Sequence, residues 1–343
     1  MIKTIPLTKE NIKTIALPGL ERNLFSSAAW LSVLCQTYKL SLFAKYIEEN
    51  DQIKSYIIYS IVDNFLEQKI CICSYCDYFD CHVQTPEHWQ MFFDSLRKEY
   101  PRYRIAIRNL RDQLARENPN FALLSKERFH ILDINDDLDS IWKKTHDSFR
   151  SAVKQAQKNG IEVKRGARAD LDKFYKLHLR LRKSKYRLFP QPFRFFDKIW
   201  REYMESGNGF LLGAYNRDGK FVGGNVFLRC GDTLYYKFNT SDLNFVKLRV
   251  NNLLLWEGIK LAKELNLKFL DLGSSGYEQH GLIMFKDHVG AKCLDICHLG
   301  FNPPDYKFSQ KRILKVFTHT LTAPWVPDFI TRAGSSIIYP FLA

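Results

Sequence analysis

Polar side chains suited to acid–base chemistry lie at the ends of two predicted strands. Asp271 ends the apolar strand 268–272, and Tyr236 and Asn239 lie near the end of the strand before it. Ligands of open α/β sheets contact the carboxyl ends of strands, so these three side chains are candidates for one cleft. Asp271 can take a proton or orient a nearby lysine. Equally, it can cap the turn that follows, and the sequence leaves both roles open.

One segment carries nearly all of the excess positive charge. The net charge of the 343-residue chain is +14, yet residues 1–137 hold 17 Lys and Arg against 18 Asp and Glu. Residues 143–202 hold 18 Lys and Arg against 6 Asp and Glu. Such a field attracts polyanions, namely nucleic acid, nucleotide diphosphates or anionic lipid headgroups. The alternative is a solvated helical face that only keeps the protein soluble.

Aromatic residues alternate with the basic ones in that segment, a mixture that suits phosphate contact combined with stacking. We therefore expect Tyr186 and Arg187 to contact the substrate. Arg150 could hold a phosphate or carboxylate through two parallel hydrogen bonds. A structural ion pair is the alternative for Arg150.

Four of the eight cysteines lie close together and are followed by His82; they are Cys71, Cys73, Cys76 and Cys81. Thiolates and imidazole at short spacing can bind zinc. The spacing fits a zinc motif loosely, however, and Cys71 and Cys73 alternate in an apolar run, where free cysteine packs as a small hydrophobic residue. We predict no metal site and reduced thiols.

The order of predicted elements indicates an α/β (α+β) fold. Residues 1–137 read as mixed helix and strand, with helices at 27–38 and 86–100. Three strands joined by hairpin turns then precede a helix at 251–265, with Asn251 or Asn252 as N-cap, and the strand 268–272. A strand, a helix and a second strand in sequence imply a parallel crossover. An antiparallel meander that leads into one parallel crossover is the outline of a GNAT domain.

The polar cluster Asn135-Asp136-Asp137 marks a boundary between periodic segments. We predict a first domain at 1–137, a second at 138–305, and a tail at 306–343 with a basic stretch that includes Lys307, Lys311, Arg312 and Lys315. Such a tail either packs on the domain, which we favour, or touches a membrane surface.

Several short pieces, in order, resemble the Fem-type transferases of the GNAT superfamily. Residues 148–160 resemble a helix with the pattern Arg-x-x-[Ile/Val]-x-x-Ala-x-x-x-Gly. The other pieces are Asn225 to Phe227, Tyr235-Tyr236, Asn252 to Trp256, Phe269 to Gly273, Gly281-Leu282, Phe285-Lys286 and Gly290-Ala291. The likeness covers residues 20–300, and its most specific part runs from Tyr236 to Gly290.

This resemblance implies two GNAT-like domains, each a mixed, mostly antiparallel sheet flanked by helices. It also implies transfer of an amino acid from aminoacyl-tRNA, or of an acyl group, to a nucleotide- or lipid-linked envelope precursor in peptidoglycan or polysaccharide synthesis. The long coiled-coil insertion of some tRNA-using members is absent here, which weakens the tRNA prediction.

Acyl transfer to an amine requires a positioned donor carbonyl, a partner for the oxyanion and removal of a proton. The resemblance places Lys286 at the reaction centre beside Phe285, where a lysine would stabilise the oxyanion by about 3 kcal/mol. Its structural alternative is a surface lysine near a helix end. The sequence has no Gly-x-Ser-x-Gly elbow, Walker loop or His-Glu-x-x-His motif, so we predict direct attack by the amine without a covalent intermediate.

The segment 247–252 bears on the acyl donor. GNAT acetyltransferases have a glycine-containing turn here, whose backbone N–H groups hold the pyrophosphate of CoA. This chain has no glycine in the segment, which counts against standard CoA binding. Lys247 and Arg249 could bind a phosphate through their side chains, and Asn252 could contact the substrate. The donor is therefore aminoacyl-tRNA or acyl-CoA, and we predict no tightly bound cofactor.

Two further functions stay open from the sequence. One is acyl-CoA-dependent N-acetylation of a sugar, lipid or small-molecule amine, and the other is a non-catalytic nucleic-acid-binding module. No run reaches the roughly 18 to 20 apolar residues of a membrane span, and the N-terminus lacks the apolar core of a signal peptide. We expect a cytoplasmic protein with possible peripheral contact with the inner membrane surface. Its expected partners are an anionic acceptor and tRNA.

Overall fold

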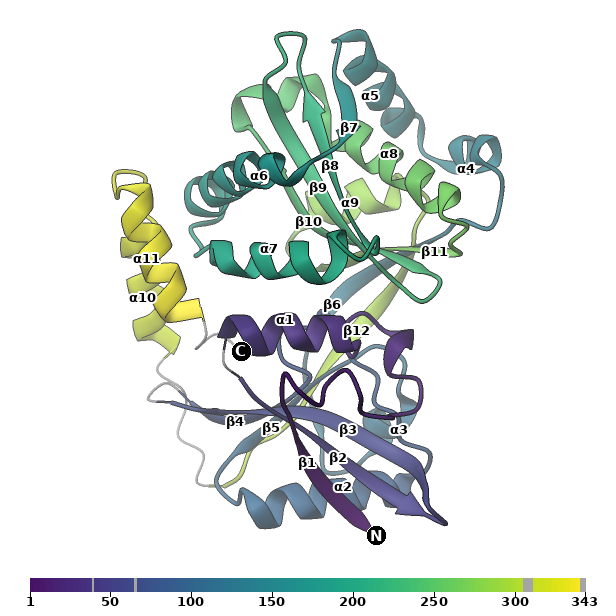
Figure 1. Ribbon diagram of the computed structural model, residues 1–343, viewed down its shortest axis with the longest axis vertical. Helices are drawn as coiled ribbons and strands as arrows, with labels where there is room; N and C mark the ends of the chain where they lie inside the picture. Colours follow the sequence, from purple (N-terminus) through teal and green to yellow (C-terminus); the bar gives the residue numbers. More distant parts are fainter. Residues whose placement is uncertain (39, 65–66, 305–310, 340–343) are drawn as a thin grey trace. The chain divides into compact units, whose positions relative to one another are not determined.

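The computed structural model describes residues 1–38, 40–64, 67–304 and 311–339 (Figure 1). The chain forms two compact units that interleave in sequence. The first comprises Met1–Glu127, Asp295–Lys315 and Ile338–Ala343, and the second comprises Arg128–Leu294 and Val316–Ile337. These divisions differ from boundaries at 137 and 305, because two long strands each contribute residues to both units.

The first unit contains a mixed sheet in the order β1-β2-β3-β4-β5-β12. The strands are β1 (Ile2–Leu7), β2 (Ser41–Glu49), β3 (Gln52–Asp63), β4 (Gln68–Ile72), β5 (Arg104–Asn109) and β12 (Lys292–Phe301). All neighbours pair antiparallel except β4 and β5, which are joined through α2 (Pro86–Glu99). Helix α1 (Ala28–Tyr38) precedes the meander, and α3 (Gln113–Glu117) follows β5.

The second unit repeats this plan, in the order β6-β11-β10-β9-β8-β7. Its strands are β6 (Ala122–Asp133, from Arg128 on), β7 (Glu162–Arg165), β8 (Gly209–Tyr215), β9 (Phe221–Cys230), β10 (Thr233–Ser241) and β11 (Phe269–Ser275). Only β10 and β11 are parallel, and α8 (Val250–Glu264) connects them. Each unit is thus an antiparallel meander followed by one parallel crossover, which confirms the predicted fold class.

Two adjacent glycines show how helices cover both faces of this second sheet. A Cβ on Gly223 would lie 2.8 Å from Val250 of α8, whereas one on Gly224 would lie 3.2 Å from Phe174 of α6 (Arg168–Leu181). Because neighbouring strand residues point to opposite faces, α8 and α6 cover opposite sides. Helix α5 (Asp147–Lys158) packs against α8, and together they bury the main apolar cluster of the unit.

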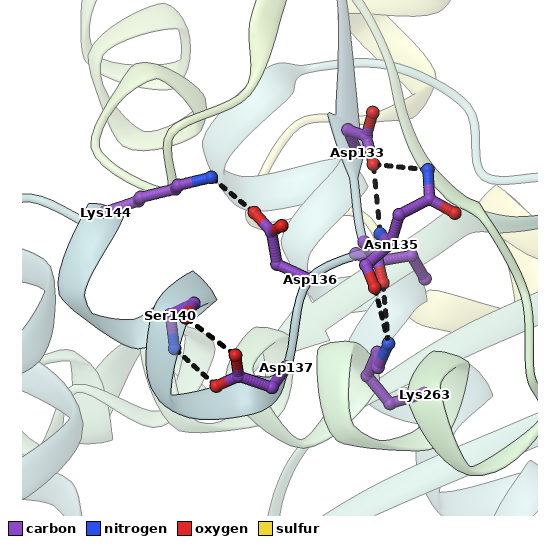
Figure 2. A network of polar contacts seen from close by, with 8 residues as sticks. Asp133, Asn135, Asp136, Asp137, Ser140, Lys144 and Lys263 are labelled. Carbon is purple, nitrogen blue, oxygen red and sulfur yellow. Dashed lines mark hydrogen bonds and ion pairs between the residues drawn. The ribbon is translucent and has the colours of Figure 1, made fainter.

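The turn after β6 is a hydrogen-bonded structure rather than an open linker (Figure 2). Asp133 accepts hydrogen bonds from the backbone and side-chain nitrogens of Asn135, at 3.0 and 2.7 Å. Asp137 caps α4 (Leu138–Lys144) by accepting from the backbone nitrogen of Ser140 at 2.8 Å. Lys263 of α8 donates to the carbonyl of Ile134 at 2.9 Å. The predicted polar boundary therefore fixes the start of α4 against α8.

The second unit also contains α7 (Phe193–Ile199), α9 (His280–Asp287) and the Val316–Ile337 part of α10 (Lys311–Leu321) and α11 (Asp328–Ile338). The last two helices lie in the tail predicted at 306–343, and Lys307 of the predicted basic stretch lies outside the described residues. No helix in the described part of the chain combines the length and apolarity that a transmembrane span requires.

Candidate active site

The parallel strands β10 and β11 separate soon after they pair. Their pairing extends from Thr233–Phe269 to Tyr235–Asp271, although β10 continues to Ser241. The register of β10 against β9 shifts between Tyr236 and Phe238, and β11 shifts against β6 between Asp271 and Ser274. These irregularities lie at the same level of the sheet. They divert both strands and leave space between them, as bulges commonly do near active sites.

Helix α8 begins at this opening. Arg249 precedes the helix in a left-handed conformation, with φ of 57°, and no side chain caps the helix there. The prediction that Asn251 or Asn252 is the N-cap is therefore wrong, because a left-handed turn at Arg249 already starts the helix two residues earlier. Glycine usually occupies such a position. The chain thus forms the tight turn before α8 without the glycine that the sequence analysis found missing.

A pocket of about 400 Å³ lies where these features meet, within the second unit. It is lined by residues of η2 (a π-helical turn, Arg182–Tyr186), β10, the segment before α8, α8 and α9. Of the residues predicted to bind substrate, the structure brings six together here: Tyr186, Tyr236, Asn239, Arg249, Asn252 and Phe285. The lining drawn from the described residues contains the cations Lys185 and Arg249 and no carboxylate. With the N-terminus of α8 beside it, this pocket favours anions.

Tyr236 gives the pocket an uncharged hydroxyl group. Burial raises the pKa of the Tyr236 phenol well above its usual range, and the neighbouring phenol of Tyr186 adds to the rise. The group is therefore fully protonated near neutral pH and can donate a hydrogen bond or a proton.

Three asparagines form a chain at the same pocket. The Nδ2 of Asn239 lies 2.6 Å from the Oδ1 of Asn225 and 3.3 Å from the Oδ1 of Asn251. Asn225 is fully buried, and its Nδ2 has no hydrogen-bond partner among the described residues. The sequence analysis placed Asn225 in a motif and treated Asn251 as a cap, so it missed both as site residues.

Lys286 is buried beneath the end of β11 and does not line the pocket. Its Nζ donates to the carbonyls of Gly273 and Ser274, at 3.0 and 2.9 Å, and to the Oγ of Ser275 at 2.8 Å. The exposed fraction of Lys286 is 3%, so the surface alternative from the sequence is wrong. The ammonium group holds the last residues of β11, just before the loop 276–279 that leads to the pocket-lining helix α9.

Asp271 is also buried and caps the turn that follows. Its Oδ1 accepts a hydrogen bond from the backbone nitrogen of Gly273 at 2.7 Å. Gly273 has a φ of 70°, a left-handed conformation that glycine tolerates best. This contact corresponds to the capping role left open in the sequence analysis, and it fixes the same strand end that Lys286 holds.

Three other predicted binding residues lie away from the pocket lining. Arg150 donates to the carbonyls of Trp142, Lys143 and Thr145 and pairs with Asp147, so it fastens the end of α4 to α5. Arg187 donates to the carbonyl of His319 at 2.6 Å. Lys247 is exposed. Spacing along the chain predicted their neighbourhood but not the direction of their side chains.

The residues that the sequence analysis missed come from short irregular elements. They include Lys185, Ser241, Phe245, Val246, Gln279 and Leu282. Leu282 belongs to one of the motif pieces and Lys185 to the basic segment, so the sequence offered grounds to predict both as site residues. The others lie on a 3₁₀ turn, at a strand end and at a helix start. These elements are too short to show the periodicity from which a sequence predicts structure.

The cysteine cluster lies in the first unit, with Cys73 and Cys76 buried and Cys71 and Cys81 half-buried. Cys73 donates to the carbonyl of Phe25 at 3.2 Å, and burial raises the pKa of the thiols of Cys71, Cys73 and Cys81. All eight cysteines are free. Within the described residues, no cluster of three or more His, Cys, Asp or Glu side chains could hold a metal ion. These thiols pack as core residues.

The sequence and the fold both resemble known proteins. Residues 143–280 match the Acetyltransferase (GNAT) domain family. Among solved structures, FemX is 15% identical, with a TM-score of 0.66, and the alignment covers 92% of this chain and 100% of FemX. No curated protein matches the sequence.

Two further structures share the tandem architecture. A tandem GNAT protein from the clavulanic acid biosynthesis pathway is 9% identical, with a TM-score of 0.57, covering 90% of this chain and all of that one. L-PGS from Bacillus licheniformis is 11% identical, with a TM-score of 0.54, covering 85% of this chain and 90% of L-PGS. At these identities the structural likeness establishes the fold. The sequence match shows a GNAT-type domain at residues 143–280, and the chain has the fold of FemX.

Proposed function

We propose that the pocket between β10 and the start of α8 is the acyl-transfer site. In this proposal the enzyme transfers an acyl or aminoacyl group to an amine of an anionic, nucleotide- or lipid-linked precursor of the cell envelope. The observation that carries the proposal is the pocket's electrostatic character. Two cations and the open end of a 15-residue helix face it without a carboxylate, beside a neutral phenol.

The reaction proceeds by direct attack of the acceptor amine. Its nitrogen bonds to the donor carbonyl carbon, and the bond from that carbon to sulfur or ribose oxygen then breaks. Tyr236 is placed to give its proton to a leaving ribose oxygen, because its raised pKa keeps the proton on the phenol until an alkoxide develops beside it. A leaving thiolate is a weaker base than this phenolate and departs without the proton. The surplus proton of the amine passes to water, from which Tyr236 is reprotonated.

Lys286 and Asp271 act from behind the pocket in this proposal. They hold Gly273–Ser275, the last residues of β11, from which the loop 276–279 leads into α9, and α9 carries Phe285 to the pocket lining. The oxyanion role predicted for Lys286 would require Nζ to exchange one of these contacts for the substrate. Both roles require the ammonium group, and rate measurements distinguish them, as described in the Discussion.

The first experiment tests Tyr236 by removing only its hydroxyl. We expect Tyr236→Phe to lower kcat by about a hundredfold, the usual size of a general acid's contribution, with little change in KM. Tyr235→Phe is the matched control, because Tyr235 is the neighbouring residue of β10, is equally aromatic and does not line the pocket. Equal rates for wild type and Tyr236→Phe would remove Tyr236 from the mechanism.

A second candidate function, acyl-CoA-dependent N-acetylation, is favoured by the open N-terminus of α8. Helix N-termini of this kind bind phosphate groups. Calorimetry with acetyl-CoA and with aminoacyl-tRNA distinguishes the two donors. We expect aminoacyl-tRNA to bind with an affinity that falls steeply as salt rises, because many phosphates would be neutralised. Binding of acetyl-CoA without binding of tRNA would establish the second function instead.

A further inference from the structure

The hairpin of α10 and α11 exposes large apolar side chains and buries side chains that carry hydroxyl groups. Among its described side chains, the buried ones include the hydroxyl residues Thr318, Thr322, Thr331 and Ser335, with Ala323 and Val326 in the connection between the helices. Its exposed side chains include six large apolar ones: Val316, Phe317, Trp325, Phe329, Ile330 and Ile337. Trp325 is 76% exposed and Phe329 70%. Helices that pack on a soluble domain normally direct their apolar face inward.

Two of these hydroxyl groups donate to carbonyls within the hairpin, and a third, that of Ser335, donates to the carbonyl of Pro190. Thr322 donates to the carbonyl of Thr318 at 2.6 Å, and Thr331 donates to the carbonyl of Leu321 at 2.9 Å. A Cβ on Gly334 would lie 3.4 Å from Leu321. Small and hydroxyl residues let two helices approach closely, as they do in lipid. The large apolar side chains are left for another contact.

The hairpin is fastened to the catalytic unit at the pocket-lining segment. Buried Lys183 donates to the carbonyl of Val326 and pairs with Asp328 at 2.9 Å. Arg187 donates to the carbonyl of His319. Lys185 and Tyr186, which line the pocket, lie between these two tethers in sequence. Whatever binds the hairpin is therefore connected to the rim of the pocket through five residues.

Charge indicates what covers the apolar face. Lys315 and Arg332 are exposed on the hairpin, and the only carboxylate of its described residues, Asp328, is paired with Lys183. A symmetric dimer through this face would bring like charges together. An anionic lipid surface accommodates both the cations and the apolar side chains, and Trp suits the boundary between headgroups and acyl chains. Each helix has 11 residues, too few to cross a bilayer.

We propose that the α10–α11 hairpin binds in the plane of a membrane surface that contains anionic phospholipids, with Phe317, Trp325 and Phe329 inserted among the headgroups. This binding does not require the transfer activity. Docking would bring the pocket rim, through Lys183 and Arg187, toward the surface that carries lipid-linked substrates.

The test is co-sedimentation of the full chain with phosphatidylcholine vesicles that contain about 30% phosphatidylglycerol, and with vesicles of phosphatidylcholine alone. We expect binding to the anionic vesicles that weakens at least about tenfold in Phe317→Ser/Phe329→Ser, because bound apolar area sets the affinity. Met91→Ser, an exposed apolar residue of α2, is the matched control and should bind as wild type does. The thermal midpoint of each variant confirms that it folds.

Three results would overturn the proposal. The first is absence of wild-type binding to anionic vesicles at low salt. The second is equal binding to the two kinds of vesicle, or equal binding by wild type and the double variant. The third is a dimer in solution, measured by light scattering, that the double variant dissociates while vesicles have no effect. That result would assign the face to a second copy of the chain.

Discussion

At the scale of single residues, the structure separates cations that face the pocket from cations that hold the chain together. Arg249 lines the pocket, whereas Arg150 binds three carbonyls and Lys286 binds two. A buried ammonium group with carbonyl partners stabilises a loop, and its removal leaves those partners unsatisfied. The two kinds of cation should respond differently to substitution.

Arg249 and Lys247 provide one comparison. The sequence predicts both as phosphate ligands, but only Arg249 lines the pocket. We expect Arg249→Gln to weaken binding of the anionic donor by about tenfold or more, since a charge-assisted hydrogen bond is lost. Lys247→Gln should change the affinity for the donor by less than about twofold. Titration calorimetry measures both, and equal losses would show that the pocket residue has no special role.

Lys286→Met tests the buried lysine. We expect the free energy of unfolding to fall by about 1–3 kcal/mol, because the carbonyls of Gly273 and Ser274, at the end of β11, lose their donor. We also expect kcat to fall by about a hundredfold or more. An oxyanion role predicts a KM close to that of wild type, whereas displacement of the loop raises KM as well. Unchanged turnover would exclude both roles, and unchanged stability would exclude the positioning role.

At the scale of elements, the contact of β9 with α8 sets the position of the pocket wall. Gly223→Ala would place a Cβ 2.8 Å from Val250, the first residue of α8, and 3.1 Å from the carbonyl of Thr240. Overpacking of this kind costs about 1–3 kcal/mol. Gly224→Ala crowds the opposite face, toward α6. We expect both variants to lose stability, but only Gly223→Ala to weaken donor binding, as calorimetry beside thermal unfolding would show.

The same scale explains what the sequence could predict. Strand ends and ordered motif pieces predicted Tyr236, Asn239, Asn252 and Phe285, which line one pocket, because alternation and crossover topology determine which edge of the sheet those residues share. They could not show that Arg187 turns toward α10, since spacing does not determine side-chain direction. The helices α10 and α11 were left within an unassigned tail although both are amphipathic, and periodicity does not determine which face of a helix is buried.

At the scale of the whole molecule, acid should weaken the second unit through His178. This imidazole is surrounded by Phe174, Phe196 and Phe238 and shares a hydrogen bond with Gln191 at 2.9 Å. Burial lowers the pKa of His178 to about 3, with Arg182 contributing. The unfolded chain binds this proton below about pH 6.5 and the folded chain does not, so stability is complete above that pH and is lost toward pH 3.

Within this pH range, His178 alone lowers the free energy of unfolding by about 1.4 kcal/mol for each pH unit. We expect the urea midpoint of wild type to fall between pH 7 and pH 5. His178→Phe, which keeps the aromatic packing without a titrating group, should fall distinctly less. Parallel slopes for the two proteins would show that other groups account for the acid sensitivity.

The interleaving of the two units has a consequence for synthesis on the ribosome. The sheet of the first unit needs β12, yet Asp295–Phe301 follow every strand of the second unit in the chain. Domains of a nascent chain usually complete in order from the N-terminus. Here β5 has one unpaired edge until the ribosome has synthesised almost the entire second unit. The first unit to begin folding is therefore the last to close, and a nascent chain that stalls before residue 295 would expose an open sheet edge to chaperones.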